Sequence, residues 1–287
     1  LSLEKGDVLG LIGPNGCGKT TSIMCMLSLL KYDSGTIEVF GKKDISNEYE
    51  IKKKIGIVPQ ELAVFNNLTV KENIDYFCGL YISNKNERKR LVNEAIEFTG
   101  LQSHEKMLEK KLSGGLKRRL NIACGISHKP ELVILDEPTV AVDAQSRKFI
   151  LDGIKNLAEN GSSILYTTHY LDEAEYLCNK ISIMDNGKNI LTGDMQTLIN
   201  GVSVKEKITV VGFIKPEIIS ILENQDEVID IETKENQVTF NYSTDTGNIK
   251  KLIYLLDENN VVYEEIFSKK PKLEDIFLEM TGKELRE

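Results

Sequence analysis

A glycine-rich loop carries the clearest chemical signal in the sequence. Gly13, Gly18, Lys19 and Thr20 form the pattern G-x-x-x-x-G-K-[ST], which binds nucleotide phosphates where it joins a strand to a helix. Glycines let backbone N–H groups approach the anion, and the following helix adds its N-terminal dipole. Lys19 brings a positive charge to the β- and γ-phosphates, and the Thr20 hydroxyl can bind Mg²⁺. The expected nucleotide contacts are Gly13, Pro14, Asn15, Gly16, Cys17, Gly18, Lys19, Thr20 and Thr21.

Two adjacent carboxylates form a second chemical feature. Asp136 and Glu137 follow the apolar run at residues 132–135. A carboxylate at the end of a buried strand is rigid and partly desolvated, so Asp136 is expected to bind Mg²⁺ directly or through water. Glu137 is then placed to accept a proton from the water that attacks the γ-phosphate. The alternative for both residues is a solvated strand end without a chemical role.

Strands that alternate with helices are expected to position both features. Apolar runs predict strands at residues 7–12, 36–40, 55–58, 132–136 and 163–167, and a hairpin of 181–184 with 189–191. Helices are predicted at residues 19–30, 144–159 and 171–177, and over most of 70–127. This alternation predicts a doubly wound α/β domain. It also gives the glycine-rich loop its strand and helix, which disfavours a chance turn.

The last third of the chain differs in charge and in pattern. Residues 1–202 carry 25 Lys and Arg against 26 Asp and Glu, whereas residues 203–287 carry 11 against 18. Strands are predicted there at 207–211, 228–232, 238–242 and 261–267, and helices at 216–224, 247–258 and 273–280. The order β-α-β-β-α-β is that of a ferredoxin-like α+β domain, so we expect a second domain over residues 203–287.

Composition excludes several classes of protein. A net charge of −8 does not fit a basic nucleic-acid binder, and no apolar run approaches the roughly 18 residues of a membrane span. No signal peptide opens the chain, so a link to the membrane is expected to come through a partner. Five cysteines without C-x-x-C spacing argue against a disulfide framework or a zinc site and favour free thiols in the cytoplasm.

A third motif makes the sequence resemble a known family. Ser113, which is followed by Gly114 and Gly115, lies 23 residues before Asp136. The phosphate loop, this SGG segment and the Asp136–Glu137 pair, in this order, resemble an ATP-binding cassette (ABC) ATPase over residues 1–195. The resemblance implies a P-loop NTPase (RecA-like) core with a helical subdomain at about residues 66–130, within a nucleotide-binding domain of residues 1–202.

The resemblance implies roles for four further parts of the chain. Gln60 matches the Q-loop and would position the attacking water or Mg²⁺, and His169 matches the switch histidine that contacts the γ-phosphate. Asp143 matches the D-loop. In the family, two subunits form a homodimer, in which the SGG segment of one closes on the ATP of the other. The alternatives are a loop amide for Gln60, a structural histidine for His169, and helix N-caps for Ser113 and Asp143.

Two departures from the family pattern stand out. Leu116 takes the place of the usual glutamine, which removes an amide near the ribose and is expected to weaken function without abolishing it. Only twelve residues precede Gly13, so the family's adenine-stacking aromatic and its strand are expected to be missing, with lower nucleotide affinity. Cys17 lies inside the loop, so its alkylation is expected to block nucleotide binding, and ATP to protect it.

The end of the chain narrows the resemblance. Residues 273–285 look like the C-terminus of drug-resistance and sodium-efflux type bacterial ABC exporters, whose ATPase pairs with a separate membrane permease. Residues 65–82 fall where that family docks onto the permease; the alternative is an ordinary amphipathic helix. The function expected is therefore hydrolysis of Mg-ATP to power export, at the cytoplasmic face of the membrane. The alternatives are a soluble ABC ATPase that acts on nucleic acid or in translation, and an ATP sensor without turnover.

Overall fold

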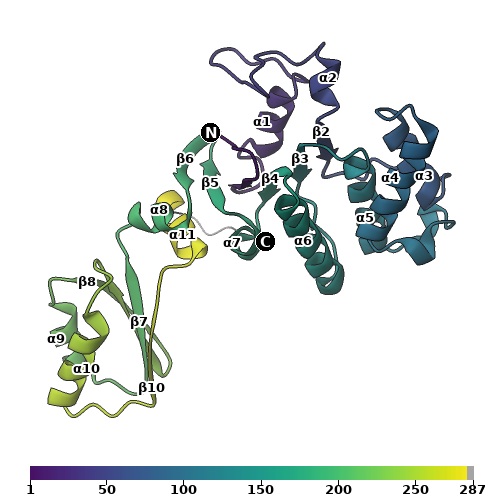
Figure 1. Ribbon diagram of the computed structural model, residues 1–287. Helices are drawn as coiled ribbons and strands as arrows, with labels where there is room; N and C mark the ends of the chain where they lie inside the picture. Colours follow the sequence, from purple (N-terminus) through teal and green to yellow (C-terminus); the bar gives the residue numbers. More distant parts are fainter. Residues whose placement is uncertain (283–287) are drawn as a thin grey trace. The chain divides into compact units, whose positions relative to one another are not determined.

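The computed structural model describes residues 1–282, which form two compact units. The first unit comprises Leu1–Thr192, and the second begins at Gly193 (Figure 1). The sequence places this boundary at 202/203. The structural boundary comes earlier because α8 (Met195–Asn200) packs against α11 (Leu273–Thr281) of the second unit. In residues 1–282, no helix has both the length and the apolar character needed to cross a membrane.

A six-stranded sheet forms the centre of the first unit, in the order β2-β3-β4-β1-β5-β6. Its strands are β1 (Val8–Ile12), β2 (Ile55–Val58), β3 (Leu132–Asp136), β4 (Ser163–Thr168), β5 (Lys180–Asp185) and β6 (Lys188–Gly193). The first five of these strands pair in parallel. The carboxyl ends of these strands therefore lie at the same end of the sheet. The phosphate loop follows β1, Asp136 is the last residue of β3, and His169 follows β4.

Apolar side chains cover both faces of this sheet. On one face, Leu11 and Ile134 pack with Ile23 of α1 (Lys19–Met26). On the other, Leu135 and Tyr166 pack with residues of α6 (Ala144–Glu159) and α7 (Leu171–Leu177). Burial on both faces explains why β1 and the first four residues of β3 are apolar without alternation. The predicted α/β class is confirmed.

A helical layer occupies the segment between β2 and β3. It contains α3 (Val70–Gly79), α4 (Lys85–Phe98) and α5 (Gly114–Ile126), with short 3₁₀ turns at Gln102–His104 and Glu109–Lys111. The three helices pack around their own apolar core, in which Ile74, Val92 and Leu120 are buried. Figure 1 shows them as a distinct group beside the sheet. Thr69 starts α3 with a capping box to Glu72.

Two predicted elements of the first unit are wrong in extent or kind. The helix after the phosphate loop ends at Met26 rather than at Leu30, because Ser28 adopts a φ of 57° that no helix continues through. No strand forms at residues 36–40, where Val39 makes only an isolated bridge with Lys42. A strand needs a partner along its length, and the described residues supply none there. A short helix, α2 (Tyr49–Lys52), was not predicted.

The second unit has the predicted ferredoxin-like order. Its strands are β7 (Glu206–Val211), β8 (Val228–Lys234), β9 (Gln237–Tyr242) and β10 (Glu265–Lys269), arranged β10-β7-β9-β8 with antiparallel neighbours. Its other helices are α9 (Pro216–Glu223) and α10 (Asn248–Glu258). The prediction placed β10 four residues early and missed α8. Residues 283–285 of the exporter-like C-terminus lie outside the described residues.

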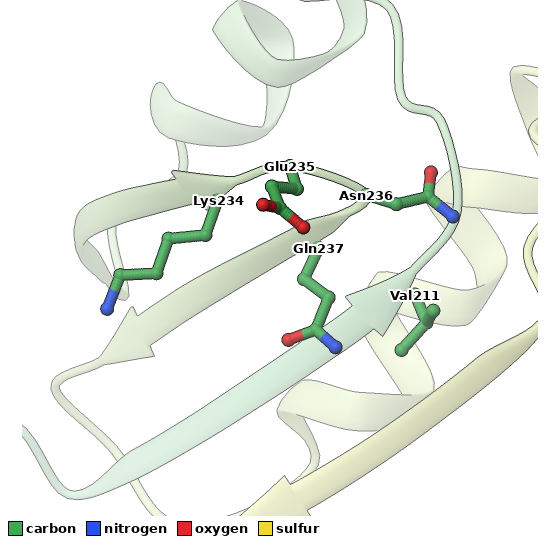
Figure 2. Close-up of a pocket in the computed structure, with 5 residues that line it drawn as sticks. All are labelled: Val211, Lys234, Glu235, Asn236 and Gln237. Atoms are coloured by element: carbon green, nitrogen blue, oxygen red, sulfur yellow. The ribbon is translucent and has the colours of Figure 1, made fainter.

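A hollow of about 560 Å³ lies beside the turn that joins β8 to β9. Figure 2 shows the residues that line it. These are Val211, Lys234, Glu235, Asn236 and Gln237. None of them belongs to the expected nucleotide-binding residues, which all lie in the first unit.

Candidate active site

The phosphate loop connects β1 to α1 and depends on glycine at three positions. Gly18 is the N-cap of α1 with a φ of 105°, and Gly16 has a φ of 80°, both in the region that favours glycine. A Cβ added to Gly13 would lie 2.1 Å from the carbonyl oxygen of Met184. The loop therefore has the backbone path that a phosphate cradle at a helix N-terminus requires, and the chance-turn alternative is not supported.

The Lys19 side chain is buried at the mouth of this loop. Its Nζ donates hydrogen bonds to the carbonyl oxygens of Gly13 at 2.8 Å and of Pro14 at 3.3 Å. The same ammonium lies 3.3 Å from Glu137 Oε1. A positive charge held beside the loop and the carboxylate can stabilise the charge of a bound phosphate chain.

Thr20 and Asp136 are brought together although they are 116 positions apart. Thr20 Oγ1 donates to Asp136 Oδ2 at 2.8 Å, and Thr167 Oγ1 donates to Oδ1 at 2.5 Å. A hydroxyl and a carboxylate are oxygen donors of the kind that Mg²⁺ prefers. Residues 1–282 contain no cluster of three or more His, Cys, Asp or Glu that could hold a metal by itself.

Glu137 lies at the centre of the predicted catalytic residues. It is buried, so the alternative of a solvated strand end is wrong. Its N–H donates to Thr167 O at 3.2 Å and Oγ1 at 3.0 Å, which holds the residue at a φ of 46°. Its Oε2 accepts from Gln60 Nε2 at 3.3 Å and lies 3.4 Å from His169 Nδ1. With Lys19 at Oε1, three predicted side chains meet one carboxylate.

The Gln60 segment is held by two residues of α5 that the sequence did not single out. The Arg118 guanidinium donates to Pro59 O at 3.2 Å and to Gln60 O at 2.9 Å. Asn121 adds a bond to Pro59 O at 3.3 Å and accepts from Ala63 N–H at 3.1 Å. Burial lowers the pKa of Arg118. The sequence signal that could have identified Arg118 and Asn121 is their spacing of three residues, which places both polar side chains on the same face of α5 as apolar residues.

The His169 ring is nearly buried at the end of β4. Its Nδ1 is buried and makes no hydrogen bond within the described residues, although Glu137 Oε2 is near. The ring packs against Tyr170, with the two centroids 4.2 Å apart. A buried ring nitrogen without a hydrogen bond is compatible with a ligand-contacting histidine, and the same feature occurs at His128 Nδ1.

Ser113 and Asp143 both cap helices, as their alternative interpretations predict. Ser113 Oγ accepts from Leu116 N–H at 3.4 Å, and Asp143 Oδ1 accepts from Ser146 N–H at 2.9 Å. Between them lies Gly115, where an added Cβ would be 2.4 Å from Ser146 Oγ and 2.9 Å from Asp143 Oδ2. The structure thus brings these two motifs together. The hydrogen bonds described for Ser113 and Asp143 are with α5 and α6, not with the phosphate loop.

Comparison with known proteins identifies the family. Residues 1–140 match the family model described as "ABC transporter". The chain is 38% identical over 292 residues to the linearmycin resistance ATP-binding protein LnrL of Bacillus subtilis (strain 168). That alignment covers 100% of this chain and 93% of LnrL. The chain belongs to the ABC transporter family of ATP-binding proteins.

Other relatives and solved structures agree with this assignment. The Nod factor export ATP-binding protein I of Sinorhizobium fredii is 30% identical over 286 residues, with 100% of this chain and 81% of that protein covered. The structure of cbiO1 from Clostridium perfringens, described as part of the ABC transporter complex cbiONQ, aligns with a TM-score of 0.63 and 26% identity. The alignment covers 71% of this chain and 85% of cbiO1.

A dimeric ATP-binding cassette in a post-hydrolysis state, bound to ADP and Pi, supports the same fold. It aligns with a TM-score of 0.62 and 24% identity over 68% of this chain and 88% of that one. As a member of the ABC transporter family, the chain is an ATP-binding, ATP-hydrolysing subunit of a transporter, as predicted. The alternative of a cassette that acts on nucleic acid gains no support from these matches.

Proposed function

We propose that Glu137 is the general base for ATP hydrolysis in this site. The supporting observation is that one buried carboxylate contacts Lys19, Gln60 and His169 together. Glu137 would take a proton from water as the water oxygen bonds to the γ-phosphorus and the bond to the ADP oxygen breaks. Lys19 would balance the phosphate charge, and His169 and Gln60 would orient the γ-phosphate and the water.

We further propose that Thr20, Asp136 and Gln60 serve a bound Mg²⁺. The hydrogen bond from the Thr20 hydroxyl to the Asp136 carboxylate supports this, as does a second hydrogen bond, from Thr167, that fixes Asp136. When bound, Mg²⁺ supplies charge neutralisation to the β- and γ-phosphates. The chain's own task is to hold these oxygen ligands rigidly at the edge of the sheet.

We infer that two copies of the chain enclose two ATP molecules. Ser113 and Gly114 are exposed at the N-terminus of α5, where the backbone N–H groups and the helix dipole favour an anion. A second copy would offer its phosphates to this helix end. Dimeric cassettes among the structural neighbours support the proposal.

We propose that the transporter exports its substrate through a separate membrane permease, on whose cytoplasmic face this chain sits. The names of two relatives, a linearmycin resistance ATP-binding protein and a Nod factor export ATP-binding protein, support this direction. A docking surface is available on α3 and the loop before it. Phe65, Tyr76 and Phe77 form this aromatic surface, with ring centroids 4.9, 5.9 and 5.4 Å apart, and Phe65 and Tyr76 are 44% and 48% exposed.

Glu137→Gln tests the catalytic proposal. Glutamine keeps the size of the side chain and one acceptor oxygen but cannot take a proton, so turnover of ATP should fall by roughly 10²–10⁴-fold. Binding of ATP, measured by equilibrium titration, should persist because the loop and Lys19 are unchanged. A variant that hydrolyses ATP at the wild-type rate would remove Glu137 from the role of base.

A further inference from the structure

Glu173 is a fully buried carboxylate that the hydrolysis mechanism above does not use. It lies in the first turn of α7, and its side chain is 0% exposed. Its Oε1 accepts from Arg147 Nε at 2.5 Å, and its Oε2 accepts from Tyr166 OH at 2.6 Å and Thr168 Oγ1 at 3.0 Å. A buried charge persists only where it is paired and hydrogen-bonded, so this carboxylate holds its three partners in one arrangement.

Thr168 connects this carboxylate to His169. Thr168 ends β4 and directly precedes His169 in the chain. Its Oγ1 donates to Glu173 and accepts from the Tyr170 N–H at 2.9 Å. The residues on both sides of His169 are therefore fixed by Glu173, one directly and one through Thr168. A change at Glu173 would therefore first alter the position of the His169 imidazole.

Arg147 and Tyr166 extend the network to two other segments of the site. Arg147 lies in the first turn of α6, and its backbone N–H donates to the carbonyl oxygen of Asp143 at 2.8 Å. Tyr166 OH lies 3.5 Å from Thr139 Oγ1, two residues beyond Glu137. One carboxylate thus joins the segments that carry the base, the switch histidine and the D-loop aspartate.

We propose that Glu173 is a positioning residue for ATP hydrolysis, which holds His169 against Glu137 and ties it to the helix that follows Asp143. This inference rests on the role proposed above for His169. Glu173 acts through Thr168 rather than on the nucleotide. Loss of its charge should therefore slow the chemical step and leave the binding of ATP unchanged.

Glu173→Gln in the full chain tests the proposal, with Asp172→Asn as the matched control. Glutamine keeps the size of the side chain and removes its charge. Asp172 is the exposed neighbour that pairs with Arg147 Nη2 at 2.9 and 3.1 Å. Glu173→Gln should lower kcat for ATP by roughly 10- to 100-fold, the effect of a small displacement of a reacting group, with KM unchanged. Asp172→Asn should stay near the wild-type rate.

The same substitution in a His169→Ala background separates positioning from general damage. If Glu173 acts through His169, adding Glu173→Gln to His169→Ala lowers kcat little further. If Glu173→Gln lowers kcat by the same factor in the wild-type and His169→Ala backgrounds, the inference is overturned and the role of His169 stands. The same holds if Glu173→Gln and Asp172→Asn have equal rates. A His169→Ala variant at the wild-type rate removes the role of His169 and the inference with it.

A second variant decides the question if Glu173→Gln does not fold. Thr168→Val removes only the hydroxyl that connects Glu173 to the Tyr170 N–H. It should show the same loss of kcat with an unchanged KM, in a protein whose thermal unfolding temperature is checked alongside. A wild-type kcat for Thr168→Val overturns the proposal.

Discussion

The backbone at Glu137 illustrates how single residues serve this site. Its φ of 46° is left-handed, a conformation that costs a residue with a Cβ roughly 1–2 kcal/mol. Thr167 offsets this cost by accepting the Glu137 N–H twice, at its carbonyl and at its hydroxyl. The same hydroxyl donates to Asp136. One threonine thus fixes the proposed base and a proposed metal ligand.

Cys17 is a residue whose expected reactivity the structure changes. Its thiol is 4% exposed, and burial raises its pKa although the nearby Lys19 charge lowers it. A raised pKa leaves less thiolate at a given pH, and thiolate is the nucleophile. Alkylation by N-ethylmaleimide at pH 7.5 should therefore be slower in the folded chain than in denaturant, should accelerate as pH rises, and should be slowed further by ATP.

Mass spectrometry of the peptide that contains Cys17 measures this rate. Chain that has been modified should no longer bind ATP, because the thiol fills space inside the loop, 2.7 Å from where a Cβ of Gly13 would be. Equal labelling rates in the folded and unfolded chain, or full ATP binding after modification, would contradict the prediction. Half-buried Cys25, outside the loop, serves as the internal comparison.

At the scale of elements, the contact between α5 and α6 depends on one glycine. A Cβ at Gly115 would meet Ser146 Oγ at 2.4 Å, whereas a Cβ at Gly114 would meet nothing within 4 Å. Gly115→Ala should therefore destabilise the chain by about 1–3 kcal/mol, as overpacking does. Gly114→Ala is the matched control and should change stability by less than about 0.5 kcal/mol.

Urea unfolding without nucleotide measures the stability of both variants. A role of the SGG segment in hydrolysis then does not affect the result. Equal stability of the two variants would show that α5 and α6 can separate at no cost. That result would also weaken the inference that Ser113 and Asp143 are positioned as a pair.

Elements with strong local signals were predictable to the residue. Residues 132–136 form a strand and 144–159 a helix, as expected, because an unbroken apolar run and an Asp N-cap mark them. Leu27, Leu29 and Leu30 continue the helical pattern of α1, yet Ser28 turns the chain. Sequence pattern does not report the tertiary contacts that end a helix early.

The residues of the candidate site also divide into those that the sequence reveals and those that only the structure reveals. Motifs that are contiguous in sequence, such as the phosphate loop and the Asp136–Glu137 pair, were identified from residue type and spacing alone. Arg118, Thr167 and Glu173 were not, because each bonds to a residue far from it in the chain, namely Gln60, Asp136 and Arg147. Their side chains are ordinary in sequence, and only the packing of α5, β4 and α7 gives them partners.

For the whole molecule, the aromatic surface offers a test of assembly. Phe65→Ser combined with Tyr76→Ser should leave the ATPase activity of the isolated chain unchanged, because neither side chain contacts the site. The backbone of Phe65 stays bonded to Asn73 in either case. The double variant should no longer co-purify with the proposed membrane permease, since burial of these rings is expected to drive docking.

Tyr254→Ser is the matched control for the aromatic surface. Tyr254 is 63% exposed but belongs to α10 of the second unit and not to the aromatic surface of α3. Co-purification should survive this change. Loss of the permease with Tyr254→Ser, or its retention with the double variant, would place the docking surface elsewhere.

The ion pair between Lys19 and Glu137 links phosphate recognition to the proposed base. A bound triphosphate would compete with the Glu137 carboxylate for the single ammonium of Lys19, because both are anions beside the same loop. Arrival of the nucleotide would then turn Lys19 toward the phosphates and leave the carboxylate free to face water, which would couple occupancy of the loop to the arrangement of the residues that act on the bond to be cleaved.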